Sequence, residues 1–224
     1  MNEVFISEVR NALARGDRVL LMTRHAERPH IDPEDPTFGE TLPITPGGER
    51  MAFAFGEALR GASDDVQFMS SPLNRTRLTA AQIARGMGLE GRWNHDTIPT
   101  DDIIGNGSYY YADAYVAWQL FRGGEFYRLS FQYCRDGILD GFRPLALATD
   151  LLERHVIANF TGRLGIFTSH DLFIAAFLTG RGAYSGWTIE TWVKFLDSAA
   201  IFISPDGSRR YALVRANPGD GLMV

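Results

Sequence analysis

Two apolar runs in the sequence each lead to a histidine with charged neighbours. The stretch "VLLMTRHAERPH" places His25 between Arg24 and Arg28, and the stretch "LGIFTSHD" ends in His170 and Asp171. A neutral imidazole is available as a nucleophile at neutral pH, and a carboxylic acid can protonate a leaving oxygen. Planar arginine side chains bind phosphate in a bidentate manner. These residue types therefore indicate phosphate binding and phosphoryl transfer.

Short strands must position these residues. Val19–Thr23, Val66–Ser71 and Leu164–Thr168 are apolar runs, typical of strands that are buried on both faces of a parallel sheet. Each of these runs ends in polar residues. Ligands of open parallel sheets bind outside the carboxyl ends of the strands. We therefore expect the three polar strand ends to face one crevice.

The helix after the second strand is expected to add further groups that bind an anion. Ser71 is its predicted N-cap and Pro72 its predicted first residue, and the helix is expected to reach about Arg85. Its N-terminus would favour an anion through the backbone dipole. Arg75 and Arg77 lie roughly 200° apart around such a helix. Only one of them can face the crevice, and we interpret Arg77 as a surface residue.

The other segments complete an α/β pattern. The remaining helices are expected at 3–15, between Thr45 and Gly61, at 145–160 and at 172–178. Thr45 is the predicted N-cap of its helix, with Pro46 at the first helical position. Two final strands are expected around Pro205-Asp206-Gly207, a hairpin signal. This order of strands and helices favours an α/β fold with a mainly parallel sheet.

Residues 93–145 are rich in aromatic side chains. Within them, 101–113 is typical of a loop and Ala112–Leu120 of a helix. We interpret the segment as an aromatic cap or insertion within a single domain that spans 1–224. A role in ligand binding is also open, because binding sites are often lined by aromatic residues.

Composition limits the possible partners and compartment. The net charge of −5 leaves no basic footprint for nucleic acid, and no apolar run is long enough to cross a membrane. The single cysteine, Cys134, excludes an internal disulfide, and the charged N-terminal stretch does not resemble a signal peptide. We therefore expect a cytoplasmic protein whose partner is a small phosphorylated molecule. The sequence does not indicate an oligomeric state.

Three motifs, "TRHAER", "SSPLNRTRLTA" and "TSHD", resemble the signatures of the histidine phosphatase superfamily and occur in the same order. That family includes the cofactor-dependent phosphoglycerate mutases and the histidine acid phosphatases. The resemblance covers residues 18–90 and 163–180. It implies a phosphoglycerate mutase-like three-layer sandwich with a mixed, mainly parallel central sheet. It also implies catalysis without a metal ion, and no cofactor is expected.

The resemblance assigns a role to each motif residue. His25 resembles the histidine that is phosphorylated, His170 the second core histidine, and Asp171 the acid of the acid-phosphatase branch. The positions expected to bind phosphate are Arg24, Arg28, Arg75 and His170.

Two departures from the family pattern stand out. Ala26 replaces the glycine that usually follows the first histidine, which is tolerable unless the position needs a positive φ. The proton donor is also open, because many members take a glutamate from the insertion. Asp171 is favoured here, Asp101 and Asp102 are the candidates in the insertion, and Glu27 is a weaker one.

Other uses of the histidines are less favoured. A metal site at His25, His170 and Asp171 would lie beside three arginines, and Pro29 occupies the place of a ligand one helical turn after His25. His30 could touch substrate. His95 and His155 lack a partner pattern, and we interpret His155 as a surface residue on a charged helix face.

The expected function is hydrolysis of phosphate monoesters, independent of metal, through a phosphohistidine on His25. Two alternatives remain open from the sequence. The first is a phosphoglycerate mutase-like phosphotransferase with the same core. The second is a phospho-ligand-binding protein without catalysis.

Overall fold

The computed structural model describes residues 2–31, 39–105, 109–122 and 125–216. Its centre is a six-stranded sheet with the order β1-β6-β5-β2-β4-β3. The strands are β1 (Glu3–Val4), β2 (Arg18–Arg24), β3 (Val66–Ser70), β4 (Leu164–Ser169), β5 (Ser198–Ile203) and β6 (Arg209–Val214). Strand β5 runs antiparallel to both β2 and β6, and the other pairs are parallel. The predicted mixed, mainly parallel sheet is confirmed.

The register of the central strands brings the two histidine motifs together. Thr23 pairs with Thr168, and Arg24 pairs with Ser169. The backbone N–H of His25 continues this ladder and donates to the Ser169 carbonyl at 3.1 Å. His25 and His170 therefore leave the sheet at the same edge, as the two similar sequence motifs predict.

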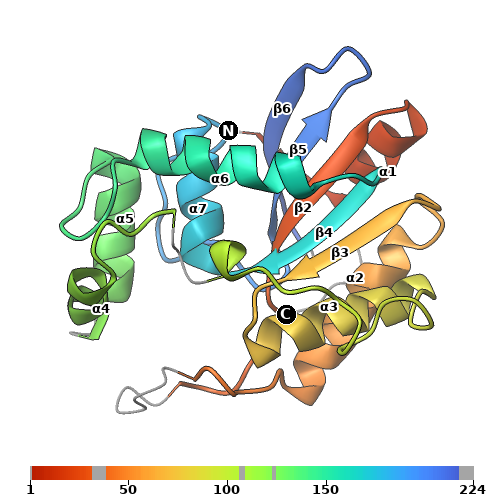
Figure 1. Cartoon of the computed structure of the whole chain (residues 1–224), viewed down its shortest axis with the longest axis horizontal. Coiled ribbons are helices and arrows are strands. Elements are labelled where there is room, and N and C mark those ends of the chain that lie inside the picture. Colours follow the sequence, from red (N-terminus) through yellow and green to blue (C-terminus); the bar gives the residue numbers. More distant parts are fainter. Residues whose placement is uncertain (1, 32–38, 106–108, 123–124, 217–224) are drawn as a thin grey trace.

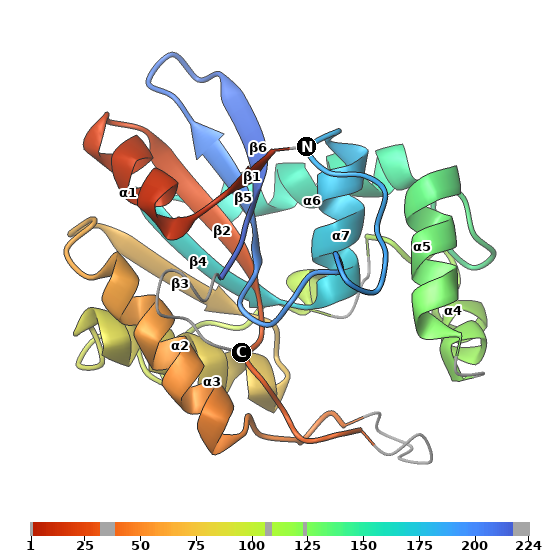
Figure 2. The ribbon, with the colours of Figure 1, turned by 180° about the vertical axis from the view of Figure 1, so that it is seen from behind.

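Helices cover both faces of the sheet, giving three layers (Figure 1). The helices are α1 (Ile6–Ala14), α2 (Pro46–Leu59), α3 (Asn74–Met87), α4 (Ala114–Arg122), α5 (Phe126–Asp136), α6 (Leu145–Asn159) and α7 (Asp171–Gly180), with a 3-10 turn, η1, at Asp102–Ile104. Successive side chains of β2 point to opposite faces. Leu20 and Met22 join the core under α5, α6 and α7, while Val19 and Leu21 join the core under α1, α2 and α3. The view from behind shows α1, α2 and α3 together on the second face (Figure 2).

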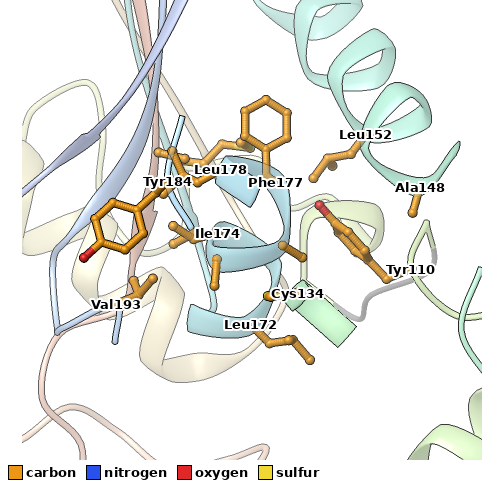
Figure 3. Close-up of a cluster of buried hydrophobic side chains, with 14 of the residues drawn as sticks. Tyr110, Cys134, Ala148, Leu152, Leu172, Ile174, Phe177, Leu178, Tyr184 and Val193 are labelled. Atoms are coloured by element: carbon orange, nitrogen blue, oxygen red, sulfur yellow. The ribbon is translucent and has the colours of Figure 1, made fainter. Parts of the chain in front are cut away.

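The aromatic insertion contributes to one of these cores. Figure 3 shows Tyr110 from the insertion beside Leu152 of α6 and the side chains of α7. The rings of Tyr110 and Tyr133 are buried and contact each other edge to face. These aromatic residues therefore belong to the same hydrophobic core as the side chains of α6 and α7.

Two of the predicted elements need correction, and one helix was not predicted. The first helix begins at Ile6, because Glu3 and Val4 instead pair with β6. Helix α3 begins at Asn74 and has Leu73 as its N-cap. The predicted cap, Ser71, still pairs with the sheet through its N–H and the Thr168 carbonyl at 3.0 Å, so the chain cannot turn into a helix there. Helix α5 was not predicted, because Phe126–Asp136 lies in the segment interpreted by its composition alone.

The predicted start of helix α2 is confirmed. Pro46 is its first residue, and the Thr45 hydroxyl accepts a hydrogen bond from the Gly48 N–H at 2.9 Å. Among the described residues, no helix combines the length and apolar character needed to cross a membrane.

Candidate active site

His25 is a buried, neutral imidazole at the end of β2. Its side chain is 4% exposed, and Nδ1 lies 2.8 Å from the Ala26 carbonyl oxygen. Because a carbonyl only accepts hydrogen bonds, this contact places the proton of the neutral ring on Nδ1 and leaves the lone pair on Nε2. Burial lowers the pKa of His25 well below its ordinary value, and the nearby charges of His170, Arg24 and Arg75 lower it further. The geometry therefore presents Nε2 as a nucleophile.

His170 lies beside His25 and caps helix α7. The two rings meet edge to face, with centroids 5.5 Å apart. The Ser71 hydroxyl lies 3.2 Å from Nε2 of His170, which explains why Ser71 does not cap α3. Burial and then the charge of Arg75 lower the pKa of His170 to about 3. Both histidines are thus neutral near pH 7.

Asp171 connects the second motif to the first. Its Oδ2 lies 3.2 Å from Nη2 of Arg24 and accepts a hydrogen bond from the Trp192 indole N–H at 3.1 Å. Burial alone would raise the pKa of the Asp171 carboxyl. The charge of Arg24, the Trp192 N–H and His170 together outweigh burial and hold that pKa below its ordinary value. Asp171 is therefore ionised in the ligand-free site.

The arginines predicted to bind phosphate gather around the histidines. Arg75 projects from the first turn of α3 and is 6% exposed, and its Nη1 donates to the Gly39 carbonyl at 2.7 Å. Burial and then the charge of Arg28 lower the pKa of Arg75 to about 10. Burial and the charge of Arg24 also lower the pKa of Arg28. Mutually repelling guanidinium groups of this kind favour a bound anion.

The hydrogen-bond capacity of these arginines is incompletely used. Within the described residues, the Nε atoms of Arg24, Arg28 and Arg75 are buried and have no hydrogen-bond partner. Buried donors are normally paired, so these Nε atoms are available to an acceptor such as a bound anion. The Nε of Arg77, outside the cluster, is also buried and without a partner in the described part of the chain. Three guanidinium charges against the Asp171 carboxylate leave two positive charges uncompensated. A phosphate dianion matches both the donors and the charge.

Two sequence candidates for the proton donor have partners elsewhere. Asp101 pairs with Nε2 of His155 through Oδ2 at 2.5 Å, and its Oδ1 accepts from the Ile103 N–H at the start of η1. Glu27 accepts from the Thr45 hydroxyl at 2.5 Å, beside the N-terminus of α2. Asp102 is exposed. Asp171 is the candidate acid that the structure places in direct contact with the arginine cluster.

Arg77 and the remaining histidines are not part of the cluster. Arg77 points away from the crevice, and its Nη2 donates to the His95 carbonyl at 2.7 Å. His30 is exposed. The interpretation of His155 as a surface residue is wrong: its side chain is only 18% exposed, because it packs against Tyr109 and pairs with Asp101.

Ala26 fits its position without strain. Among the described residues, Leu196 is the only non-glycine residue with a positive φ, so Ala26 does not need the left-handed region. Its N–H donates to the Thr79 hydroxyl at 2.9 Å, and its methyl group lies in the core under α2 and α3. The residue that must be glycine is instead Gly48, in the first turn of α2. A Cβ on Gly48 would lie 2.3 Å from the Glu27 carbonyl oxygen.

Sequence reasoning missed the segment before β5. The Phe195 ring lies 4.4 Å from Cζ of Arg24, a cation–π distance, and 5.8 Å from the ring of His25. The Val193 carbonyl accepts from Nη1 of Arg24. Leu196 has a φ of 65°, which turns the chain sharply beside the site. The predicted hairpin contains β5, and it was the available signal for this segment. Because β5 pairs antiparallel with β2, β5 begins where β2 ends, so the residues before β5 lie at the site.

Comparisons with known proteins agree with this architecture. The family model for the histidine phosphatase superfamily (branch 1) matches residues 20–96, which include His25 and Arg75. No curated protein sequence matches the chain. The solved phosphoglycerate mutase from Bacillus anthracis is 13% identical at a TM-score of 0.55, over 91% of this chain and 95% of that chain.

Two further solved structures show the same fold. A mycobacterial glucosyl-3-phosphoglycerate phosphatase in complex with VO3 is 18% identical at a TM-score of 0.52, over 88% of this chain and 97% of that one. Bacillus stearothermophilus YhfR is 13% identical at a TM-score of 0.53, over 87% of this chain and 95% of that one. The family match and the shared fold confirm the resemblance of this chain to the histidine phosphatase superfamily, with a phosphoglycerate mutase-like fold.

Proposed function

We propose that this protein is a metal-independent phosphatase that hydrolyses phosphate monoesters through a phosphohistidine on His25. The observation that carries this proposal is a buried His25 with an unprotonated Nε2 that lies beside His170 and within reach of the charges of Arg24 and Arg75. Phosphoryl transfer needs mainly positioning and stabilisation of charge on the equatorial oxygens. Arg24, Arg28, Arg75 and His170 supply those contacts.

The reaction would proceed in two displacements. In the first, Nε2 of His25 attacks phosphorus, the bond to the ester oxygen breaks, and protonated Asp171 gives its proton to that oxygen. In the second, Asp171 takes a proton from water as the water oxygen attacks the phosphohistidine. The bond between phosphorus and Nε2 breaks, which releases inorganic phosphate and restores both side chains.

Substrate binding would also supply Asp171 with its proton. In the free site the contact with Arg24 keeps Asp171 ionised. A phosphate dianion would draw Arg24 into its own coordination and add negative charge beside the carboxylate. Both effects raise the pKa of Asp171 and favour its protonated form. The low pKa in the free site is therefore compatible with a role as general acid.

The central experiment measures hydrolysis of 4-nitrophenyl phosphate in the presence of a chelator. We expect activity in the chelator and its loss in His25→Ala. After rapid quenching with labelled substrate, wild type should carry phosphate that is labile in acid and stable in alkali. Activity that survives His25→Ala, or that disappears on chelation, would contradict the proposal.

The same assay separates the alternatives. A mutase would convert a phosphoglycerate into its isomer with little release of inorganic phosphate, whereas the proposed phosphatase releases phosphate and the alcohol. A binding protein without catalysis would hold inorganic phosphate and yield no labelled His25.

A second prediction identifies the acid. 4-Nitrophenolate leaves without a proton, but ethanol does not, so Asp171→Asn should lower kcat on ethyl phosphate by about 10²–10⁴-fold and affect 4-nitrophenyl phosphate much less. Asp101→Asn is the matched control, because it neutralises a carboxylate that is paired with His155 outside the cluster. Equal losses on both substrates in Asp171→Asn would show that Asp171 is not the proton donor.

A further inference from the structure

Aromatic side chains surround the acid of the proposed reaction. Trp192, whose indole N–H is bound to Asp171, is itself buried. Helix α5 packs beside α7 (Figures 1 and 2). Three of its aromatic side chains contact this indole. Their centroid distances to Trp192 are 5.4 Å for Phe131, 6.1 Å for Tyr127 and 6.4 Å for Phe126, and all three contacts are edge to face. The insertion thus places a set of rings around the indole that donates to Asp171.

Tyr127 is the member of this set that remains open to solvent. Its side chain is 44% exposed, although its ring is held by Phe126 at 5.3 Å and by Phe131 at 6.1 Å. Such a ring, held on one side and open on the other, offers a face on which an aromatic ligand can pack.

Tyr127 is connected to the candidate site through Trp192, which it contacts and which donates a hydrogen bond to Asp171. Burial dominates the pKa of Arg28 and lowers it, whereas Asp171 and Tyr127 act in the opposite direction. Tyr127 and Asp171 therefore both lie near Arg28. Arg28, Tyr127 and Trp192 consequently border one side of the proposed proton donor.

The leaving group of a substrate must begin at this point. The ester oxygen has to lie within reach of Asp171 to receive its proton. The alcohol part then extends from Asp171 past the open ring of Tyr127.

We infer that Tyr127, supported by Trp192 and Phe131, binds an uncharged aromatic ring in the alcohol part of the substrate. The substrate class is then a phosphate monoester of an aromatic alcohol. This inference rests on the proposed function, because Asp171 fixes where the alcohol begins.

The kinetic test compares 2-phenylethyl phosphate with ethyl phosphate. Both release primary alcohols that need the same protonation, so the ratio of their kcat/KM values reports ring binding alone. We expect wild type to prefer the phenyl ester by about tenfold. Tyr127→Ala should bring this ratio close to one, and Tyr127→Phe should retain the preference. Tyr115→Ala is the matched control, because Tyr115 is a 73% exposed tyrosine on the neighbouring helix α4.

A binding test separates this inference from hydrolysis. 2-Phenylethylphosphonate and ethylphosphonate cannot be hydrolysed, and their Kd values can be measured by calorimetry in the same variants. Selective binding of the phenyl compound that depends on Tyr127, without turnover of either ester, would support the ring site and contradict the phosphatase. Equal turnover and equal binding of both compounds in wild type, or a preference that Tyr127→Ala leaves intact, would overturn the ring site alone.

Discussion

The backbone conformation at Ala26 explains why an alanine is tolerated where the family pattern has a glycine. Its φ is not positive, its N–H is bound to Thr79, and its methyl group is buried. Glycine at this position would gain nothing from its conformational freedom and would add entropy to the unfolded chain. Ala26→Gly should therefore lower the free energy of unfolding by about 0.5–1 kcal/mol in urea titrations and should not raise kcat. A higher kcat in Ala26→Gly would show that the alanine restrains the active site.

Residues at the ends of strands were the easiest part of the site to predict. His25 and His170 follow apolar runs, and paired parallel strands end at one edge, so their proximity follows from local sequence. Phe195 was not predictable in this way. It precedes β5, and β5 reaches the site only because it pairs antiparallel with β2, a choice that depends on the whole sheet.

Side-chain roles at caps were less predictable for a related reason. Ser71 has the residue type of an N-cap, but its hydroxyl lies 2.7 Å from Thr76 Oγ1 and 3.2 Å from His170 Nε2. Both partners are side chains, so the hydroxyl is used by them rather than by a backbone N–H of the first helical turn. The position of Arg75 on the first turn of α3 survives this shift, because the helix begins one residue before it.

At the scale of elements, the contact between α2 and α3 determines where Arg75 lies. Gly56 and Gly86 allow the two helices to touch through their backbones: a Cβ on Gly86 would lie 2.0 Å from the Phe53 carbonyl oxygen, and one on Gly56 would lie 2.1 Å from that of Ile83. A backbone atom cannot move aside as a flexible side chain can. The helices would have to separate, and α3 carries Arg75.

Gly86→Ala should consequently destabilise the fold and weaken phosphate binding together. We expect a loss of about 1–3 kcal/mol in the free energy of unfolding, as for other overpacked cores, and a higher Kd for inorganic phosphate in calorimetry. Gly91→Ala is the matched control, because no atom lies within 4 Å of a Cβ built there. A stable Gly86→Ala variant with unchanged phosphate affinity would show that the interface can relax without moving Arg75.

Strand β1 and helix α5 were the elements that the sequence analysis missed. Strand β1 has only two residues, and its register with Leu213 and Val214 depends on the opposite end of the chain. Helix α5 has strong amphipathic character, so the periodicity of its apolar residues was a signal for a helix. The aromatic composition of the segment indicated only an insertion. The α2 start at Thr45 and Pro46 was predictable because capping is a local interaction.

At the scale of the whole molecule, the site concentrates positive charge in a chain of net charge −5. Burial keeps both site histidines neutral, and the charges of Arg24 and Arg75 add to this effect at each of them. The two histidines therefore bind protons less readily in the folded chain than in the unfolded chain. This difference links the stability of the fold to pH.

The sign of that link follows from proton counts. The pKa values of His25 and His170 are lower in the folded chain than their ordinary value of 6.5, so below that pH the unfolded chain binds more protons. The free energy of unfolding should therefore fall as the pH decreases from 6.5 toward 4. Each histidine contributes at most about 1.4 kcal/mol per pH unit in this range. Asp171, whose pKa is also lowered, adds a loss of the same sign below its ordinary value of 3.8.

Urea unfolding at pH 7, 6 and 5, in buffers without phosphate, measures this dependence. His170→Asn removes one of the two buried titrating rings, so the loss of stability between pH 6 and pH 5 should be smaller in this variant than in wild type by about 1 kcal/mol. His30→Asn is the matched control, because it replaces an exposed histidine outside the cluster. If His170→Asn and wild type lose the same free energy over this range, the pKa of His170 is not lowered in the folded chain.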